Sequence, residues 1–385
     1  MRERQTLANY YPRVARGVHS FPLDESVDSA DRLGLGVVGL HEGRTALLAS
    51  LRTSRVRPVM GCDLDEAAIA AVRQDLPDVD FTTSYAELLA NPDVDIVGIY
   101  TPDPLHGQQI IEAFEAGKDV VCTKPVVNSF DDAKRVLAAS RATGRKLLVG
   151  QSSRFFESLR RQRQAFERGE IGDVEVVETH YTHRMDWYYD GRPWIADKSD
   201  WVFLGMSHPL DLLRWYLGPI EAVTAIGGRS AVAIENGAKS FDIYSVNAWT
   251  STGKMGRSFG HYGMHELPRA RNSIECMLYG SEGTSLAKYH DMQYLHTGED
   301  GVEVLEDMLY EYRHYHFNNE VHGAHYGEFA NYLQYFAEAL ATGSDYSPGL
   351  EEGLETFCLM EAVRRSAASG GQPVEIAPLL TELGL

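Results

Sequence analysis

The sequence predicts an α/β protein with a parallel sheet in its first part and a mostly antiparallel, open sheet in its second. From Leu35 to about Gly150, short apolar runs such as "LGVVGL" and "DIVGIYT" alternate with helical stretches such as "GQQIIEAFEAG". This alternation is typical of βαβ units with helices on both faces of the sheet. After Gly150 the strand-like runs become longer and are separated by Gly-rich turns, as in "SIECMLYGSEGTSLAKYH". We therefore expect two domains of different topology.

The expected boundaries divide the 385 residues into four parts. Residues 1–33 are polar, contain two prolines and show no period, which predicts an extended arm. Residues 34–150 are the first α/β domain, and residues 151–325 are the second. Residues 326–385 are the fourth part. At its start, from Tyr326 to Thr342, apolar side chains recur at every third or fourth position, which predicts a helix with one buried face. We expect these last helices to pack back on the core.

Composition and charge exclude several classes of protein. The chain has 36 Lys and Arg against 55 Asp and Glu, a net charge of -19, and its acidic residues are spread along the sequence. Nucleic acid is therefore not an expected partner. The apolar runs stop far short of the roughly 20 residues that a membrane-spanning helix needs, so we expect no membrane partner. The four scattered cysteines and the charged N-terminus predict a reducing, cytoplasmic location.

The first turn of the first domain carries a modified dinucleotide-binding pattern. In G-x-G-x-x-G the glycines let the backbone approach a pyrophosphate at the start of the following helix. Here the first glycine is Gly39, the second position is His41, and the last glycine, Gly43, lies one position early. We expect His41 to lie beside the phosphates or the ribose, and Arg44 to add a positive charge. An ordinary tight turn is the alternative.

An acidic residue follows the second predicted strand, "RPVMGCD". Asp63 lies slightly more than 20 residues beyond Gly39, where a carboxylate can accept hydrogen bonds from the adenine ribose hydroxyls. The same carboxylate would repel a 2′-phosphate, and the next residues, Leu64, Asp65 and Glu66, supply no cation. The pattern favours NAD over NADP.

Residues 98–137, "GIYTPDPLHGQQIIEAFEAGKDVVCTKPVVNSFDDAKRVL", resemble the glucose-fructose oxidoreductase/inositol dehydrogenase/MocA superfamily. Its members carry T-P-x-x-x-H and then a strand that ends in E-K-P. Residues 101–106 match the first motif and residues 123–125 the second, with Thr123 in place of the glutamate. The resemblance covers residues 35–220 well. It implies a Rossmann domain, an α/β domain whose open sheet forms oligomer contacts, and an active site between the two.

The resemblance also implies the catalytic groups. The family's lysine stands by the nicotinamide ring and hydrogen-bonds the reacting oxygen, which assigns that role to Lys124. Losing the glutamate at Thr123 should make this lysine easier to deprotonate. A histidine that opens a helix, with an aspartate three residues on, maps onto His208 and Asp211. Many members also have an aspartate where this chain has Leu204, so a Lys-Asp-His triad is not available. His208 is therefore the candidate base, and a histidine that caps the helix or packs in the core is the alternative.

The expected binding residues follow from these motifs and from an aromatic stretch after the domain boundary. The cofactor-binding residues are Gly39, His41, Glu42, Gly43, Arg44, Asp63, Thr101, Pro102, Asp103, His106, Thr123, Lys124 and Gln151. The substrate-binding residues are Lys124, Arg154, His183, Arg184, Trp194, His208, Asp211 and His325. The aromatic, histidine and arginine side chains of residues 180–201 suit a sugar, and His183 and Arg184 could also bind an anionic substituent. Ordinary packing is the alternative for each of them.

The late histidines do not predict a metal site. The pairs "HYGMH", "HYH" and "HGAH" lack cysteine partners, and their spacings match no common ligand pattern. We therefore expect no metal, and we assign His325 to the substrate as residues of that region are assigned in some relatives.

These observations predict an NAD-dependent oxidoreductase that oxidises a hydroxyl of a sugar, polyol or sugar derivative. A homo-oligomer, dimer or tetramer, is expected because the second sheet has too few helices to cover both faces. One alternative is an NAD-dependent glycosidase, in which oxidation, elimination, hydration and reduction cleave a glycoside, including an anionic one such as a sulfonated sugar. The other is a nucleotide-binding sensor without turnover. The presence of Lys124 and His208 argues against a sensor, but the absence of the aspartate at Leu204 leaves this alternative open. The sequence does not name the sugar.

Overall fold

A computed structural model of the chain describes residues 31–190, 192, 194–265, 272–289, 292–308 and 327–385. These residues form two compact units. The first unit holds residues 31–152 and 327–354 of the described chain, and the second holds residues 153–308 and 355–385. The chain therefore leaves the first unit, returns to it, and ends in the second. Most of the expected N-terminal arm lies outside the described residues.

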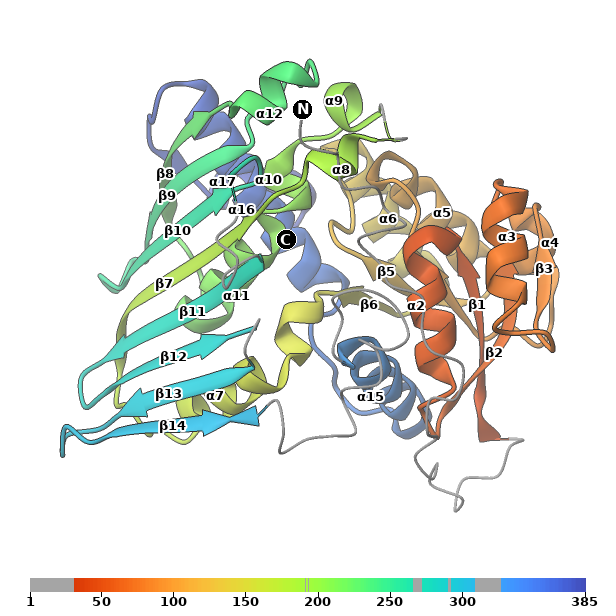
Figure 1. Ribbon diagram of the computed structural model, residues 1–385, viewed down its shortest axis with the longest axis horizontal. Coiled ribbons are helices and arrows are strands. Elements are labelled where there is room, and N and C mark those ends of the chain that lie inside the picture. Colours follow the sequence, from red (N-terminus) through yellow and green to blue (C-terminus); the bar gives the residue numbers. More distant parts are fainter. Residues whose placement is uncertain (1–30, 191, 193, 266–271, 290–291, 309–326) are drawn as a thin grey trace. The chain divides into compact units, whose positions relative to one another are not determined.

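The first unit is built on a six-stranded parallel sheet of order β3-β2-β1-β4-β5-β6. Figure 1 labels β1, β2, β3, β5 and β6 of this sheet. Its strands are β1 (Leu33–Val38), β2 (Val56–Cys62), β3 (Asp80–Thr82), β4 (Ile96–Ile99), β5 (Asp119–Thr123) and β6 (Leu147–Gly150). Strands β4 and β6 are buried along their whole length, because helices cover both faces of a parallel sheet. This order, in which β4 returns to the other side of β1, is the Rossmann order, and it confirms the predicted fold class of this unit.

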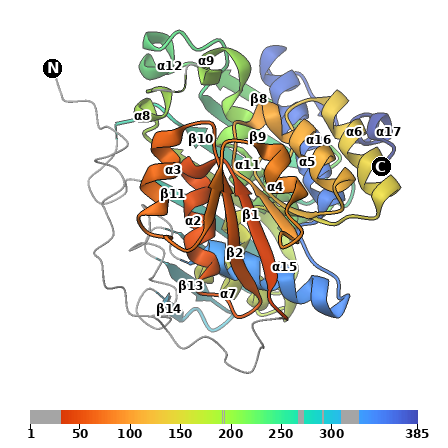
Figure 2. The same ribbon diagram turned by 90° about the vertical axis from the view of Figure 1, so that its right-hand side faces the viewer.

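Helices connect successive strands of this sheet. They are α2 (Leu40–Ser50), α3 (Glu66–Arg73), α4 (Tyr85–Ala90), α5 (His106–Glu115) and α6 (Phe130–Thr143). A short 3-10 helix, η2 (Asp103–Leu105), precedes α5. Figure 2 shows α2 and α3 on one side of the strands and α5 and α6 on the other. The starts of α3 and α6 follow from their sequence, since Asp65 and Ser129 accept hydrogen bonds from the backbone N–H groups of Ala67 and Asp132.

A helix from the later part of the chain completes the first unit. In α15 (Glu328–Thr342), Leu333 and Phe336 of the predicted apolar face are buried. This helix packs on α2 and β2. Its Gln334 accepts hydrogen bonds from the backbone N–H groups of Ser54 and Arg55 at 2.9 and 3.2 Å. Two tyrosine hydroxyls, those of Tyr100 and Tyr332, lie 2.5 Å apart in a buried hydrogen bond.

The second unit is built on a nine-stranded sheet of order β14-β13-β12-β11-β7-β10-β9-β8-β15. Its strands are β7 (Val174–His183), β8 (Ala222–Gly228), β9 (Ile243–Trp249), β10 (Met255–His261), β11 (Asn272–Gly280), β12 (Thr284–Lys288), β13 (Gln293–Thr297), β14 (Glu303–Asp307) and β15 (Val374–Glu375). Among these described strands, β7 and β10 pair in parallel and the other neighbours pair antiparallel. The prediction of a mostly antiparallel second sheet is therefore confirmed.

Among the described residues, helices cover one face of this sheet and leave the other open. The unit contains η3 (Ser152–Phe155), α7 (Glu157–Glu167), α8 (Asp186–Tyr189), α9 (Trp194–Lys198), α10 (Trp201–Leu204), α11 (Ser207–Leu217), α12 (Ala231–Glu235), α16 (Leu350–Ala368) and α17 (Ala377–Leu383), of which η3 and α16 begin in the first unit. In the covered face, α11 packs on β7, β10 and β11, and α7 packs on β12 and β13. On the open face, Ile226, Met255 and Phe259 are exposed. None of the helices within the described residues is long and apolar enough to cross a membrane.

Candidate active site

The opening turn of the first unit lies at the carboxyl end of β1, where the strand order reverses between β1 and β4. Gly39 has φ 88°, and a Cβ on this residue would lie 2.6 Å from the carbonyl carbon and oxygen of Tyr100. A side chain is therefore excluded from this position on two grounds, its backbone conformation and its close approach to the neighbouring strand end. Gly43 faces a similar limit, because its Cβ would lie 2.5 Å from Val37 Cγ1. Both glycines let α2 start directly against the sheet, as a dinucleotide-binding turn requires.

Asp63 follows β2 and lies beside this turn. Its Oδ2 accepts a hydrogen bond from the backbone N–H of Leu40 at 2.6 Å, and its Oδ1 accepts one from the N–H of Asp65 at 2.9 Å. These bonds fix the carboxylate at the start of α2. Each oxygen has a second lone pair, so a ribose hydroxyl could still donate to it.

His41 and Arg44 occupy the first turns of α2. The His41 ring is exposed, and its Nε2 lies 3.5 Å from Asp65 Oδ2. This contact joins the first turn of α2 to the N-cap residue of α3. The Arg44 guanidinium forms an ion pair with Asp75. The structure thus gives Arg44 a carboxylate partner on a neighbouring segment, and phosphate contacts by His41 and Arg44 stay predictions.

Lys124 follows β5 and is the most perturbed amine of the unit. Burial lowers the pKa of its side chain to about 8, and the carboxylates of Glu42 and Asp103 oppose that shift. Asp103 is itself buried and accepts a hydrogen bond from Asn128 Nδ2 at 2.9 Å. The substitution at Thr123 therefore does not leave Lys124 without acidic neighbours, because α2 and η2 each supply one. A buried amine whose pKa is lowered in this way is a candidate to serve a reacting oxygen.

The other predicted cofactor residues lie at the ends of β4, β5 and β6. Thr101 follows β4, and its hydroxyl bonds the side chain of Gln109. The His106 ring is buried and lies within hydrogen-bonding distance of two carbonyl oxygens. Pro102 caps η2, and Gln151 is buried just after β6. The carboxyl ends of neighbouring parallel strands thus bring together residues that are far apart in the sequence.

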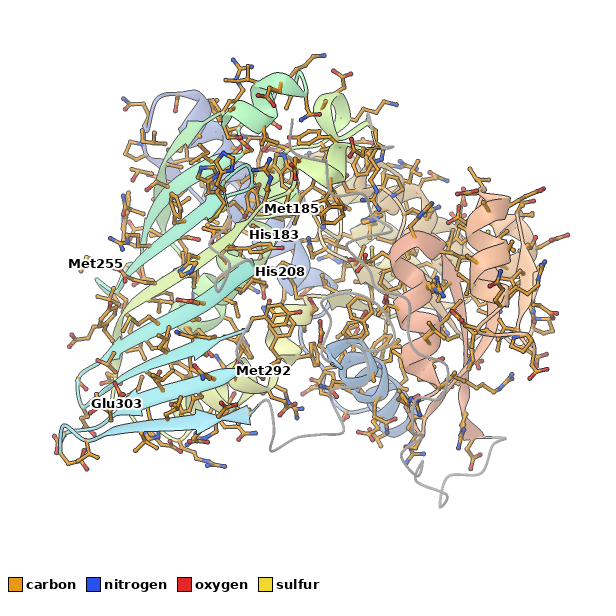
Figure 3. All side chains as sticks on the ribbon, viewed as in Figure 1. His183, Met185, His208, Met255, Met292 and Glu303 are labelled. Carbon is orange, nitrogen blue, oxygen red and sulfur yellow. The ribbon has the colours of Figure 1, made fainter. Side chains whose placement is uncertain are left out.

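In the second unit, His208 is the second residue of α11 and is buried. Its Nδ1 lies 3.4 Å from Ser153 Oγ, and its ring meets the edge of the Tyr181 ring at 5.9 Å. Figure 3 shows His208 and His183 on neighbouring elements of this unit. Leu204, at the end of α10, is buried and apolar. Ser153 and Tyr181 were not predicted, since neither belongs to a motif.

Arg154 and Asp211, both predicted substrate residues, form a buried ion pair with each other. Arg154 Nε and Nη2 donate to Asp211 Oδ2 and Oδ1 at 2.6 and 2.8 Å, and the two side chains are 2% and 1% exposed. Thr356 Oγ1 adds a third bond to Asp211 Oδ1 at 3.0 Å. Asp211 lies one turn after His208, and Arg154 follows Ser153. The ion pair therefore anchors the segments that carry His208 and Ser153. Direct contact of Arg154 or Asp211 with the substrate stays a prediction.

The strand β7 carries the remaining predicted substrate residues to one end of the sheet. His183 is buried and packs against Tyr181 and Trp187, with ring centroids 6.4 and 6.3 Å apart. Arg184 donates to Asp186 Oδ2 at 2.8 Å and lies 2.9 Å from His265 Nδ1. Asp186 therefore neutralises the cation that an anionic substituent would need. Trp194 begins α9 and is partly exposed.

Other histidines do not join this group. His180 points to the opposite face of the sheet, where its Nε2 lies 3.7 Å from Glu275 Oε2. Alternation along a strand sends every second side chain to the other face. His325 lies outside the described residues. Within the described part of the chain, no group of three or more His, Cys, Asp or Glu side chains is placed to hold a metal ion.

The geometry of the first unit fits a dinucleotide. The turn at Gly39 admits no Cβ, α2 begins directly after this turn, and Asp63 stands at the end of the next strand. In agreement, residues 33–151 match the model of the "Oxidoreductase family, NAD-binding Rossmann fold". Residues 163–376 match the model of the "Oxidoreductase family, C-terminal alpha/beta domain".

Similar proteins cover most of the chain. Inositol 2-dehydrogenase 1 of Saccharopolyspora erythraea is 27% identical over 355 residues, which are 89% of this chain and 95% of that protein. The uncharacterized oxidoreductase YrbE of Bacillus subtilis is 27% identical over 304 residues, 77% of this chain and 82% of the relative.

Two solved structures share the fold. One is an oxidoreductase from Agrobacterium radiobacter in complex with NAD+, L-tartaric acid and magnesium (TM-score 0.78, 21% identity, 91% of this chain and 100% of that chain). The other is levoglucosan dehydrogenase in complex with NADH and levoglucosan (TM-score 0.76, 20% identity, 89% and 99%). Because the two family models together span most of its length, the chain belongs to the glucose-fructose oxidoreductase/inositol dehydrogenase/MocA family of oxidoreductases, and its cofactor is NAD.

Proposed function

We propose that the protein is an NAD-dependent dehydrogenase that oxidises a hydroxyl of a sugar, polyol or sugar derivative. The observation that carries the proposal is Lys124, a buried amine with a pKa of about 8 at the end of a strand in the NAD-binding unit. The relatives support the substrate class, since they include two inositol 2-dehydrogenases besides that of Saccharopolyspora erythraea. The aromatic and histidine side chains at the end of β7 are consistent with a sugar ring.

In the proposed reaction, the chain's own residues bind, orient and move a proton. Gly39, Asp63 and the first turn of α2 would hold the dinucleotide. When bound, NAD supplies the oxidant, since its nicotinamide accepts a hydride from the carbon that carries the hydroxyl. Lys124 hydrogen-bonds the reacting oxygen and stabilises its developing negative charge. His208 accepts the hydroxyl proton. The ion pair of Arg154 and Asp211 ties the helical turn after this histidine to the residue next to Ser153.

The test is a stoichiometry measurement with purified protein, NAD and a panel of inositols, free sugars, polyols and glycosides. We expect NADH to accumulate in a one-to-one ratio with oxidised product, because a dehydrogenase releases its electrons to the cofactor once per turnover. A Lys124→Met sample is the matched control and should show no accumulation. Free sugar released from a glycoside without stoichiometric NADH, and with solvent deuterium at C2, would instead establish the glycosidase. NAD binding without turnover on any member of the panel would favour the sensor.

Asp63 is predicted to select NAD over NADP. Its carboxylate is fixed by two backbone N–H groups beside the turn at Gly39, and the exposed Asp65 adds a second negative charge nearby. A 2′-phosphate bound at this position would be repelled by the carboxylates of Asp63 and Asp65. We expect NAD to bind at least tenfold more tightly than NADP, about 1.4 kcal/mol, and Asp63→Ser to reduce this ratio. Titration of both cofactors by calorimetry measures it, and equal affinities in the wild-type protein would refute the assignment.

We also propose that the chain forms a homo-oligomer through the open face of the second sheet. On β10, Gly256 and Gly260 face the covered side, whereas Met255 and Phe259 point outward and are exposed. Ile226 of β8 is exposed on the same face, with Ser245 of β9 between it and Phe259. Apolar side chains grouped on an open sheet face are typical of a protein interface. Light scattering of the full chain against its 42.9 kDa mass measures the state of assembly.

A further inference from the structure

His106 makes two hydrogen-bonding contacts of the same kind. Its Nδ1 lies 2.7 Å from the carbonyl oxygen of Pro125, and its Nε2 lies 2.8 Å from the carbonyl oxygen of Thr101. The residue is 1% exposed, so water does not replace either contact. Both partners are carbonyl oxygens, which accept hydrogen bonds and have none to donate.

The two contacts determine which form of the ring fits this position. A neutral imidazole carries one N–H and one bare nitrogen, so it can satisfy only one of two carbonyls. The other carbonyl would then face a nitrogen lone pair at hydrogen-bond distance and would lose its partner. An imidazolium donates from both nitrogens and satisfies both carbonyls. Leaving a buried polar group without its hydrogen bond is costly, because the group has lost its contact with water and gains no partner in return.

Charged groups act on this ring from two elements. Asp103 of η2 favours the cation, whereas Lys124 after β5 opposes it. Burial is the largest effect and lowers the pKa of His106 below its ordinary value, although Asp103 and the two carbonyl contacts act in the opposite direction. The imidazolium is assigned on the two carbonyl contacts, which need two donors, and not on this pKa. The ring thus belongs to the same cluster as Lys124, Asp103 and Glu42, in which two acidic side chains face two basic ones.

The two carbonyls lie at positions that matter for Lys124. Thr101 follows β4, and Pro125 directly follows Lys124 at the end of the neighbouring strand β5. A rigid, planar ring that bonds to both carbonyls fixes the separation of these two strand ends. The backbone that carries Lys124 is thereby tied to the first residue of the T-P-x-x-x-H motif.

We propose that His106 is a positioning residue that holds Lys124, as an imidazolium donating to the carbonyl oxygens of Thr101 and Pro125. Its significance for catalysis rests on the role given to Lys124 in the proposed function. The ring itself does not contact the reacting atoms. It positions the amine and supplies a positive charge that makes Lys124 easier to deprotonate.

The first experiment needs no turnover. Nitrogen-15 NMR of the histidine side chains in the cofactor-free wild-type protein near pH 7 reports how many protons each ring carries, and the signal missing from His106→Gln assigns His106. We expect two protonated nitrogens with slowly exchanging protons. One bare nitrogen in this ring would overturn the proposal. The protonation state is read from the wild-type protein, and the variant serves only to assign the signal. If His106→Gln folds poorly, selective labelling of the wild-type histidines supplies the assignment instead.

The second experiment measures the effect on Lys124. Amine-reactive labelling at a series of pH values, read by mass spectrometry, gives the pH at which Lys124 becomes reactive in each protein. In His106→Gln, which can donate to one carbonyl, this pH should rise by at least half a unit and kcat should fall about tenfold or more. The matched control His296→Gln, on the surface strand β13, should leave both unchanged.

The outcomes separate this proposal from the proposed function. If His106→Gln leaves the labelling profile of Lys124 where it was, or leaves kcat at the wild-type level, His106 does not position the lysine. If the wild-type protein oxidises no member of the panel but the NMR and labelling results are as expected, the dehydrogenase assignment fails and the positioning of Lys124 by His106 stands.

Discussion

Lys124→Met is expected to lose turnover almost completely, with kcat reduced by about 10²–10⁴-fold. The amine is the group we assign to the reacting oxygen, and Met has a similar length but neither charge nor N–H. The affinity for NAD, measured by calorimetry, should change little. Lys134→Met, at an exposed position on α6, is the control and should keep the wild-type kcat. A Lys124→Met variant that keeps more than about a tenth of kcat would remove Lys124 from the mechanism.

The same variant should also be more stable at neutral pH. Burial lowers the pKa of Lys124 from 10.5 to about 8 in the folded chain, so folding opposes the charged form. Between these two values the unfolded chain binds a proton that the folded chain has released, and the stability of the wild-type protein therefore rises with pH through this window. We expect Lys124→Met to gain on the order of 1–2 kcal/mol at pH 7 and to lose that advantage as the pH rises from about 8 toward 10.5. Urea unfolding of both proteins at several pH values gives the difference.

Asp211→Ala is expected to destabilise the second unit by about 3–5 kcal/mol. The substitution leaves Arg154 as a buried cation without its carboxylate, and it removes the acceptor of the Thr356 hydroxyl. Denaturant unfolding measures the loss. The double variant Arg154→Met/Asp211→Leu should regain much of it, because a pair of apolar side chains of similar volume can replace a buried ion pair.

The double variant also separates a structural role from substrate contact. If the ion pair only supports the position of His208, the double variant should keep a KM near that of the wild-type protein while kcat falls. A KM that rises more than about tenfold in a well-folded double variant would show that Arg154 or Asp211 binds substrate. A loss of stability below about 1 kcal/mol in Asp211→Ala would contradict the buried pair.

The fold could be predicted from the sequence because its signals are local. The alternation of apolar runs and helices indicates parallel βαβ units, and Gly39 and Asp63 stand where a Rossmann turn requires them. The face on which a side chain lies was harder to predict. His180 and His183 lie in the same strand, yet an odd spacing puts them on opposite faces.

The partners of the site residues could not be predicted, because they join distant segments. Arg154 and Asp211 are 57 residues apart and form a pair that no motif contains. Lys124 receives its acidic neighbours from α2 and η2, and not from the position that the family's glutamate occupies. Apolar periodicity predicted the helix α15 but not the unit that it joins, since periodicity shows that a face is buried without showing what buries it.

The position of α15 in the chain sets the order in which the protein can mature during synthesis. All six strands of the first sheet have been made once residue 152 is added, but α15 begins only at Glu328. At about 5–20 residues per second, the ribosome needs roughly 10–35 s to reach it. Throughout that interval α2 lacks its covering helix, and the hydroxyl of Tyr100 lacks Tyr332. The nascent NAD-binding unit must therefore wait, with apolar surface accessible to chaperones, until the strands of the second sheet have been translated.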